Sequence, residues 1–193
     1  MAQASVARQQ TEEAFLDAAE RLLVSVGYAG ITTRALAEEA GANHGLVHYY
    51  FGSMENLLAR VLERFTERTI ARQRAMYTAS DVPFLQKWRT AMRYLDADRE
   101  YQKVWCELQA LAWNRPELRE RVAHVNAEWR AVLREAFAEP RERYRIPMPL
   151  DALVSLVITF NEGIILERLA GIEAGHAPLI EWIDGWISRT DLA

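Results

Sequence analysis

The segment of residues 31–58 constrains the fold of this chain more than any other part of the sequence. Leu36, Ala37 and Ala40 recur at the spacing that puts apolar side chains on one face of a short helix. Gly41 follows them, where a residue in the left-handed conformation commonly ends a helix. A second apolar set at helical spacing begins shortly afterwards. The order predicts two short helices joined by a tight turn.

Polar residues mark where the helices of this segment should begin. Thr32 precedes the first helix and Asn43 the second, and each side chain can accept a hydrogen bond from a free backbone N–H. Gly52 ends the second helix, and Ser53 is placed to cap a third, with Glu55 in its first turn. These signals predict a helix-turn-helix followed directly by another helix. Such a motif presents its second helix to the DNA major groove.

At these residues the chain resembles the TetR family of bacterial transcriptional regulators. The family's N-terminal unit ends in a pattern like Leu-Tyr-x-His/Tyr-Phe-x-Ser-Lys-Glu, which corresponds here to LVHYYFGSME at residues 46–55. A Gly-Tyr-x-x-Ile-Thr-Thr-Arg pattern is matched upstream at Gly27, Tyr28 and residues 31–34. The match covers roughly residues 11–60. Beyond it, only length, helicity and element order agree.

The resemblance implies an all-α fold of about nine helices. A three-helix DNA-binding unit would occupy residues 1–53, helical at 11–26, 33–40 and 44–50. A larger effector-binding and dimerisation domain would follow over residues 54–193. Apolar periodicity predicts its helices near 54–77, 84–95, 101–113, 116–137, 150–170 and 178–189, with a loop at 139–149.

The resemblance also places candidate DNA contacts: Thr33, Arg34, Asn43, His44, Gly45, His48, Tyr49 and Tyr50. Arg34 could donate two hydrogen bonds to a guanine, or form a surface ion pair with Glu38. Thr33 and Asn43 could contact phosphates or serve as caps. His44, His48 and Tyr49 would face bases or backbone, and otherwise be ordinary surface residues. Gly45 would allow close backbone approach or belong to the turn, and Tyr50 would reach a phosphate with its ring packed inward.

The charge of the N-terminal segment is unusual for a DNA-binding protein. Residues 1–53 contain three arginines against six acidic residues, a net charge of −3, whereas phosphate contacts normally need basic side chains. Met54 and Leu46 stand where family members often have Lys and Thr. The tail MAQASVARQQ could reach a minor groove through Arg8, or it could be disordered. Arginines four apart could add basic charge, or pair with Glu63 and Glu67: Arg60, Arg64, Arg68 and Arg72.

The C-terminal residues suggest an effector pocket, because aromatic walls with a few polar groups are typical of small-molecule sites. The candidates are Trp88, Trp105, Trp113, Trp129, Ser155, Thr159, Phe160 and Glu162. Their alternative roles are core packing for the rings and hydrogen bonds between helices for the polar groups.

The last helix is too apolar for a solvent-facing element, which together with the resemblance predicts a homodimer. The interface candidates are Leu179, Trp182, Ile183 and Trp186. A twofold dimer would bind a palindromic operator through half-sites about 34–36 Å apart. By resemblance, the protein would be a repressor released by a small, largely apolar or aromatic effector.

Enzyme function is not expected, because the sequence has no phosphate-binding glycine loop, metal-spaced Cys/His set or nucleophile motif. No cofactor is expected. The lone Cys106 and the lack of a long apolar segment favour a cytoplasmic protein without membrane contact. Met54, Leu46 and the acidic N-terminal segment leave one alternative open: a helical ligand- or partner-binding module whose DNA binding is weak or lost.

Overall fold

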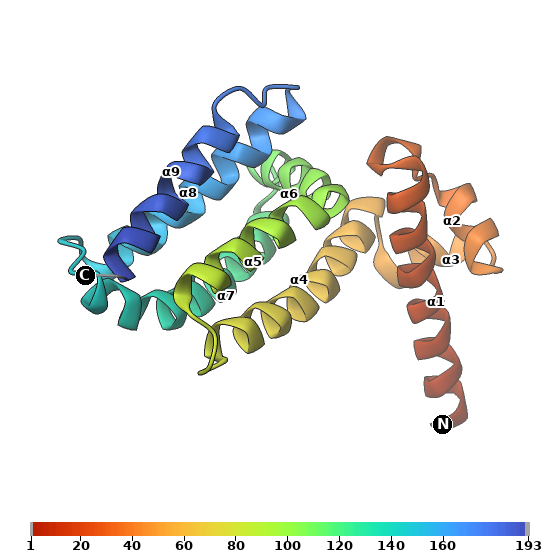
Figure 1. The fold of residues 1–193 in the computed structure, drawn as a ribbon. Coiled ribbons are helices and arrows are strands. Elements are labelled where there is room, and N and C mark those ends of the chain that lie inside the picture. The colour runs from red at the N-terminus through yellow and green to blue at the C-terminus, as the bar shows by residue number, and fades with distance from the viewer. Residues whose placement is uncertain (1, 192–193) are drawn as a thin grey trace. The chain divides into compact units, whose positions relative to one another are not determined.

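The computed structural model describes residues 2–191, with side chains at residues 6–27 and 29–190. Over these residues the fold is entirely helical, as predicted (Figure 1). The elements are α1 (Ala2–Val26), the 3-10 turn η1 (Tyr28–Gly30), α2 (Thr33–Ala40), α3 (Gly45–Phe51), α4 (Met54–Thr78), α5 (Phe84–Ala97), α6 (Arg99–Ala112), α7 (Pro116–Arg143), α8 (Leu150–Leu169) and α9 (His176–Asp191).

The helices divide into two compact units that cut across chain order. The N-terminal unit consists of Met1–Thr66 and Glu100–Val122, and the C-terminal unit of Glu67–Arg99 and Ala123–Ala193. The N-terminal unit is therefore larger than the expected segment 1–53. It includes the first half of α4, nearly all of α6 and the start of α7.

The core of the N-terminal unit draws on every one of its helices. Phe15 of α1 and Phe51 of α3 pack edge to face, with ring centroids 6.2 Å apart. Leu36 and Val47 are fully buried between them and α4. The later helices close this same core through Val104, Leu108, Ala112 and Leu118. Burial of these side chains supplies the main driving force for holding the four N-terminal helices together.

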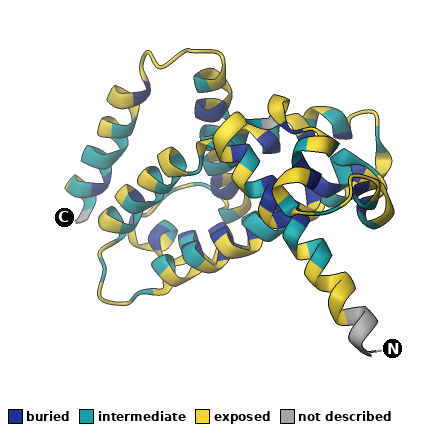
Figure 2. Cartoon of the chain, turned by 90° about the vertical axis from the view of Figure 1, so that its right-hand side faces the viewer, coloured by how far each residue is buried: buried dark blue, intermediate teal, exposed yellow. Residues whose placement is uncertain are grey.

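The first helix begins earlier than predicted, at Ala2 rather than Thr11. Thr11 was expected to be the first residue of the helix, but its hydroxyl donates a 2.9 Å bond to the Ala7 carbonyl, as a threonine inside a helix does. The preceding residues include no Gly or Pro, so nothing interrupts the helix. Residues 6–10 of this helix are exposed, and buried residues gather in its second half (Figure 2). The disordered-tail interpretation of this segment was wrong.

The C-terminal unit holds two apolar clusters. Phe137 and Val154 anchor one, and Trp88, Tyr144 and Ile187 form the other. The expected loop at 139–149 was wrong in its first part, because α7 continues through Pro140 to Arg143. Pro140 lies in the last turn, where its missing N–H removes only one late helical bond. The buried Tyr144 ring packs at the end of this turn and holds it in place.

Candidate nucleic-acid interface

The turn between α2 and α3 is built by the residues that the sequence pointed to. The Thr32 hydroxyl accepts a 3.1 Å bond from the Ala35 N–H at the start of α2. Gly41 ends that helix at φ +63°, and the Ala42 N–H reaches back 2.9 Å to the Ala37 carbonyl. This is the double-bonded cap for which glycine is favoured, because a Cβ is strained at positive φ. The turn therefore has a fixed geometry.

The start of α3 is held by Asn43, whose Oδ1 accepts a 2.9 Å bond from the Gly45 N–H. Asn43 thus has the capping role considered for it. Val47 and Phe51 face the core, while His44 and His48 are exposed on the opposite side of the helix. One short helix accordingly presents a polar face to solvent and anchors its other face.

The remaining α3 candidates divide between surface and core. Gly45 and Tyr49 are exposed. Tyr50 is half-buried, with its ring centroid 6.3 Å from that of Phe15, so the ring packs inward as expected. The Nδ1 atom of His48 lies 3.2 Å from the Gly52 carbonyl oxygen. An N–H there leaves Nε2 of a neutral ring as an acceptor that faces outward.

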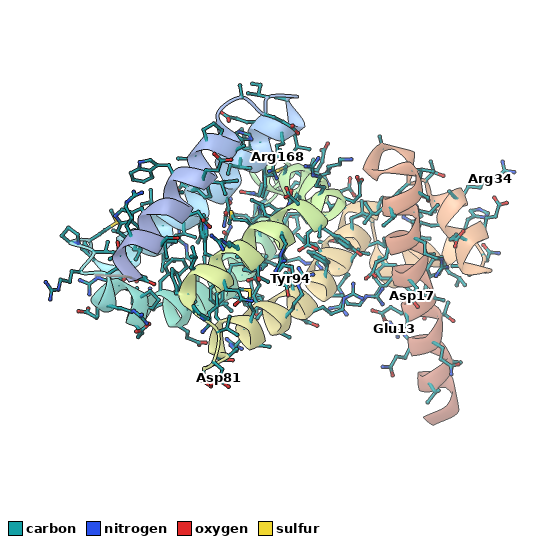
Figure 3. The ribbon with its side chains drawn as sticks, in the orientation of Figure 1. Glu13, Asp17, Arg34, Asp81, Tyr94 and Arg168 are labelled. Carbon is teal, nitrogen blue, oxygen red and sulfur yellow. The ribbon has the colours of Figure 1, made fainter. Side chains whose placement is uncertain are left out.

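Arg34 extends outward from the start of α2, beside half-buried Thr33 (Figure 3). Among the described residues it makes no ion pair with Glu38, the partner that would have given it a purely surface role. Its five N–H donors are therefore available for an external acceptor.

Arg64 of α4 pairs with several of the acidic side chains of the N-terminal unit. Its guanidinium donates 2.8 Å hydrogen bonds to the carboxylates of Glu13, Asp17 and Glu20, all on α1. The labelled Glu13 and Asp17 lie on the side of α1 that faces α4 (Figure 3). Burial lowers the pKa of Arg64, but the hydrogen bonds that it donates to Glu20 and Asp17 raise it by more, so the net shift is upward. Three carboxylates are thus neutralised in part by one inward-facing arginine.

Other acidic residues of this unit are also paired. Arg60 lies 3.7 Å from Glu12, and Arg21 lies 2.5 Å from Glu39. Of the six acidic side chains in residues 1–53, only Glu38 lacks an ion pair within the part of the chain that the structure describes. The net charge of −3 therefore overstates the negative charge near α3. These ion pairs also show that Arg60 and Arg64 of α4 both pair with acidic residues of α1.

Arg8 has contacts that the sequence did not predict. Its guanidinium carbon lies 5.8 Å from the ring centroid of Tyr49 and 5.9 Å from that of Tyr50, within range of a cation–π contact. It therefore sits beside the exposed face of α3.

The two departures from the family pattern have a packing explanation. Met54 and Leu46 are half-buried and pack against the core of the N-terminal unit. Both side chains therefore add apolar contacts where a Lys or Thr would present a polar group.

The candidate effector residues fall into different environments. In the C-terminal unit Trp88 is buried and its ring centroid lies 6.0 Å from that of Phe160. Ser155 accepts a 3.0 Å bond from Arg130, which is the interhelical role considered for it. Trp129 and Glu162 are half-buried and Thr159 is exposed.

Two of the predicted pocket tryptophans belong to the N-terminal unit. Trp105 packs against the core of that unit. Trp113 is 78% exposed, so it encloses no cavity within one chain. The expectation that tryptophans at helical spacing share one pocket is not met at these positions, because α6 contributes to the core of the N-terminal unit.

The candidate dimer residues of α9 point in two directions. Leu179 and Trp182 are exposed, Trp182 by 64%. Ile183 and Trp186 instead pack inward, with the Trp186 ring 6.0 Å from that of Tyr144. The apolar character of α9 thus serves both the core and a solvent-facing stripe. Exposed leucines on α8, among them Leu156 and Leu166, are further apolar surface in this unit.

No described helix combines the length and apolar character needed to cross a membrane. Among the described residues, no group of three or more His, Cys, Asp and Glu side chains could hold a metal ion.

Comparison with known proteins agrees with the geometry of α2 and α3. Residues 15–61 match the family model described as bacterial regulatory proteins, tetR family. This range contains the turn, the exposed α3 face and the start of α4. No curated protein sequence matches the chain.

Solved structures share the fold along nearly the whole chain. A protein from Rhodococcus sp. RHA1, assigned as a transcriptional regulator, aligns with a TM-score of 0.76 at 19% identity, covering 92% of this chain and 93% of its own. A TetR transcription regulator from Haloarcula marismortui has a TM-score of 0.69 at 17% identity, covering 94% and 96%.

A third structure, the transcriptional regulator FadR from Bacillus subtilis in complex with stearoyl-CoA, has a TM-score of 0.67 at 14% identity, covering 91% and 96%. At these identities the likeness establishes the fold. The assignment itself comes from the matched helix-turn-helix. By that match, residues 15–61 are similar to the DNA-binding unit of the tetR family of bacterial regulatory proteins, and the chain as a whole shares the all-helical fold of solved structures of such regulators.

Proposed function

We propose that the protein is a transcriptional repressor that binds a palindromic operator as a homodimer and is released by a small, largely apolar effector. One observation carries the DNA-binding part: α3 buries Val47 and Phe51 while its opposite face presents His44, His48 and Tyr49 to solvent. A helix anchored in this way can enter a major groove without unfolding its support.

The proposed contacts follow from donor and acceptor chemistry. Arg34 donates two hydrogen bonds to a guanine or to a phosphate. His44 and His48 meet base edges, where Nε2 of a neutral His48 accepts from the amino group of adenine or cytosine. Tyr49 and Arg8 lie together at one edge of this surface and contact the sugar–phosphate backbone.

Thr33, Asn43, Gly45 and Tyr50 complete the proposed interface from the start of α2 and from α3. Their groups suit backbone contacts, which fix the register of the protein on the duplex without reading sequence. The capping bond of Asn43 uses one lone pair of Oδ1 and leaves its NH₂ free to donate.

The exposed apolar side chains of the C-terminal unit support the dimer. Leu156, Leu166, Leu179 and Trp182 are all at least 43% exposed, and isolated soluble chains rarely leave large apolar patches open to water. A twofold dimer through α8 and α9 would cover them and would present two copies of α3 to a palindrome.

The effector is proposed to act by population shift. Such an effector binds more tightly to a conformer in which the spacing of the two α3 helices does not match the operator. The difference between its affinities for the two conformers sets how far it releases DNA. The stearoyl-CoA complex of the Bacillus subtilis neighbour is a precedent for an effector with a large apolar part in this fold. Trp88 and Phe160 offer aromatic surface for such a part.

The alternative function, a helical module with lost DNA binding, has less support from the geometry. It rested on the acidic N-terminal segment and on Met54 and Leu46. Most of that acidic charge is paired with arginines, and both apolar residues pack against the core.

Selection of bound fragments from random duplex DNA tests the proposal. A repressor of this kind enriches a palindrome, and its binding to the selected duplex exceeds that to random duplex at every salt concentration. Enrichment of no sequence, with weak binding that disappears at moderate salt, would favour the alternative. A single half-site would contradict the dimer and leave DNA binding intact.

A further inference from the structure

The ring of His48 is held by the backbone at the end of its own helix. Its Nδ1 atom lies 3.2 Å from the Gly52 carbonyl oxygen, four residues further along the chain. The Gly52 N–H in turn donates a 3.0 Å bond to the His48 carbonyl, so two contacts join the same two residues. The His48 side chain nevertheless remains exposed, on the face of α3 that carries the proposed DNA contacts.

The carbonyl partner decides which nitrogen of a neutral His48 ring carries the proton. A carbonyl oxygen can only accept, so the hydrogen of this bond must be on Nδ1. A neutral imidazole has a single N–H, and its other nitrogen is then an acceptor. Nε2 of His48 is therefore the acceptor, and the exposed ring offers it to a donor outside the protein.

The backbone conformation of Gly52 aims its carbonyl at this ring. Gly52 has φ +74° and ψ −45°, a combination that residues with a side chain rarely adopt. A Cβ at this position would meet nothing closer than the side-chain nitrogen of Asn56, at 3.8 Å. The conformation, and not a lack of space, therefore favours glycine here. The bond between Gly52 and His48 depends on that conformation.

His44 provides a contrast on the same face of the interface. Its ring is also exposed. Among the described residues its side chain caps nothing and has no hydrogen-bond partner. Either nitrogen of a neutral His44 can carry the proton, so this ring can meet a donor or an acceptor equally well. Of the two histidines, His48 is the one whose acceptor is fixed.

The four bases differ in whether they present a donor to such an acceptor in the major groove. Adenine presents its N6 amino group and cytosine its N4 amino group, and each can donate to a ring nitrogen. Guanine presents two acceptors, O6 and N7, and thymine presents O4. An acceptor that faces another acceptor leaves both without a partner once water is removed, which costs free energy.

We propose that Gly52 and His48 together determine one position of the operator, at which the base facing Nε2 is adenine or cytosine and both guanine and thymine are excluded. Gly52 is a positioning residue, which acts through the tautomer of His48. This assignment rests on the proposed DNA-binding function and names the class of base that this part of the interface reads. His44 has no such preference.

Nuclear magnetic resonance of the whole protein, isotopically labelled at its histidines, tests the tautomer without DNA. The chain has four histidines, so replacing each in turn by Gln assigns every ring. Spectra are recorded at alkaline pH, where imidazole rings are neutral. His48 should carry its proton on Nδ1, whereas His44 should show the mixture of tautomers of an unconstrained ring. A proton on Nε2 of His48 overturns the assignment.

Gly52→Ala and Gly41→Ala form a matched pair. Both glycines have positive φ and room for a Cβ, so both variants introduce backbone strain without a clash. Gly52→Ala should displace the carbonyl and move His48 toward the tautomer mixture, whereas Gly41→Ala should leave its tautomer unchanged. Equal His48 spectra in the two variants would show that Gly52 does not position the ring. The wild-type spectrum decides the tautomer even if Gly52→Ala does not fold.

Selection from random duplex DNA with wild type and with His48→Ala identifies the base that His48 reads, because only that position should lose its preference. Wild type should select adenine or cytosine there. That base is then replaced by its analogue without the amino group, purine for adenine or 2-pyrimidinone for cytosine. Wild type should bind the altered duplex about 2- to 10-fold more weakly, the usual net effect of one neutral hydrogen bond. His48→Ala should bind both duplexes equally.

The outcomes separate this assignment from the proposed function. Guanine or thymine at the position that depends on His48, no position that depends on it, or equal wild-type affinity for the two duplexes overturns the assignment while DNA binding stands. Selection of no sequence by wild type overturns the DNA-binding function itself, a result on which the spectra of the free protein do not depend.

Discussion

Arg64→Ala should destabilise the protein more than any other substitution of an exposed or half-exposed arginine in the N-terminal unit. Arg64 is 20% exposed and its partner Glu20 is 17% exposed. A hydrogen bond to a charged group in such a setting contributes about 1.5–3 kcal/mol. Glu13 and Asp17 are more than half exposed, so their bonds contribute about 0.2–1 kcal/mol each.

The expected loss is therefore about 2–5 kcal/mol of the free energy of unfolding, a large part of the 5–15 kcal/mol typical of natural proteins. Urea unfolding followed by circular dichroism at 222 nm measures it, provided the slope with urea is unchanged. Arg64→Lys should recover part of the loss, because lysine keeps the charge but not the planar fork. High salt should reduce the difference only slightly, since the Glu20 bond is mostly buried.

Arg60→Ala is the matched control on the same helix. Arg60 is 53% exposed and its carboxylate partners lie 3.6 and 3.7 Å away, so the expected loss is below about 1 kcal/mol. The reasoning fails if Arg64→Ala costs no more than Arg60→Ala. It also fails if a double-mutant cycle of Arg64→Ala with Glu20→Ala gives no coupling energy.

Three further predictions concern DNA, assembly and pH. Arg34→Ala should weaken binding to the selected operator by about 1–3 kcal/mol in fluorescence anisotropy with oligomeric state unchanged; equal affinity would remove Arg34 from the interface. Trp182→Glu should give a folded monomer in light scattering, because the side chain is exposed in one chain, and a persistent dimer would place the contact elsewhere. Hydrogen bonds from Arg89 hold the pKa of Asp184 below its usual value. That stabilisation is present at neutral pH and lost as pH falls through the lowered pKa, so Asp184→Asn should be less stable than wild type at pH 7 and equal to it well below pH 4. A stability difference that stays constant down to pH 2 would show that the ion pair is not its source.

The turn at the centre of the interface could be predicted because its determinants are local. Thr32, Gly41 and Ser53 each act within five residues of their own position, so chain order alone indicates where the helices begin and end. The family pattern lies in the same segment. Fold class and the position of α3 therefore followed from sequence.

Errors at helix boundaries arose where a residue type has two roles. Thr11 can cap a helix or bond back inside one, and the structure uses the second option. Pro140 usually ends a helix, but here Tyr144 is buried just after it and stabilises the final turn. Only tertiary packing distinguishes these alternatives.

The partners of Arg64 could not be found from sequence, since they lie 44 to 51 residues away along the chain. The same reason explains the tryptophans. Helical spacing places Trp88 and Trp105 on amphipathic helices, but it does not show which core each helix joins.

The participation of residues 100–122 in the N-terminal core restricts how this gene can change by recombination. A crossover at residue 66 would transfer the helix-turn-helix segment, residues 1–66, without Val104, Leu108 and Leu118. The recipient protein would then have to supply equivalent core side chains from its own sequence. A fragment ending there should aggregate, because Leu57, Leu58 and Val61 would lose part of their cover. New specificities for the proposed effector should therefore arise by substitution within α4 and α7, the long helices that contribute to both units, more readily than by exchange of whole segments.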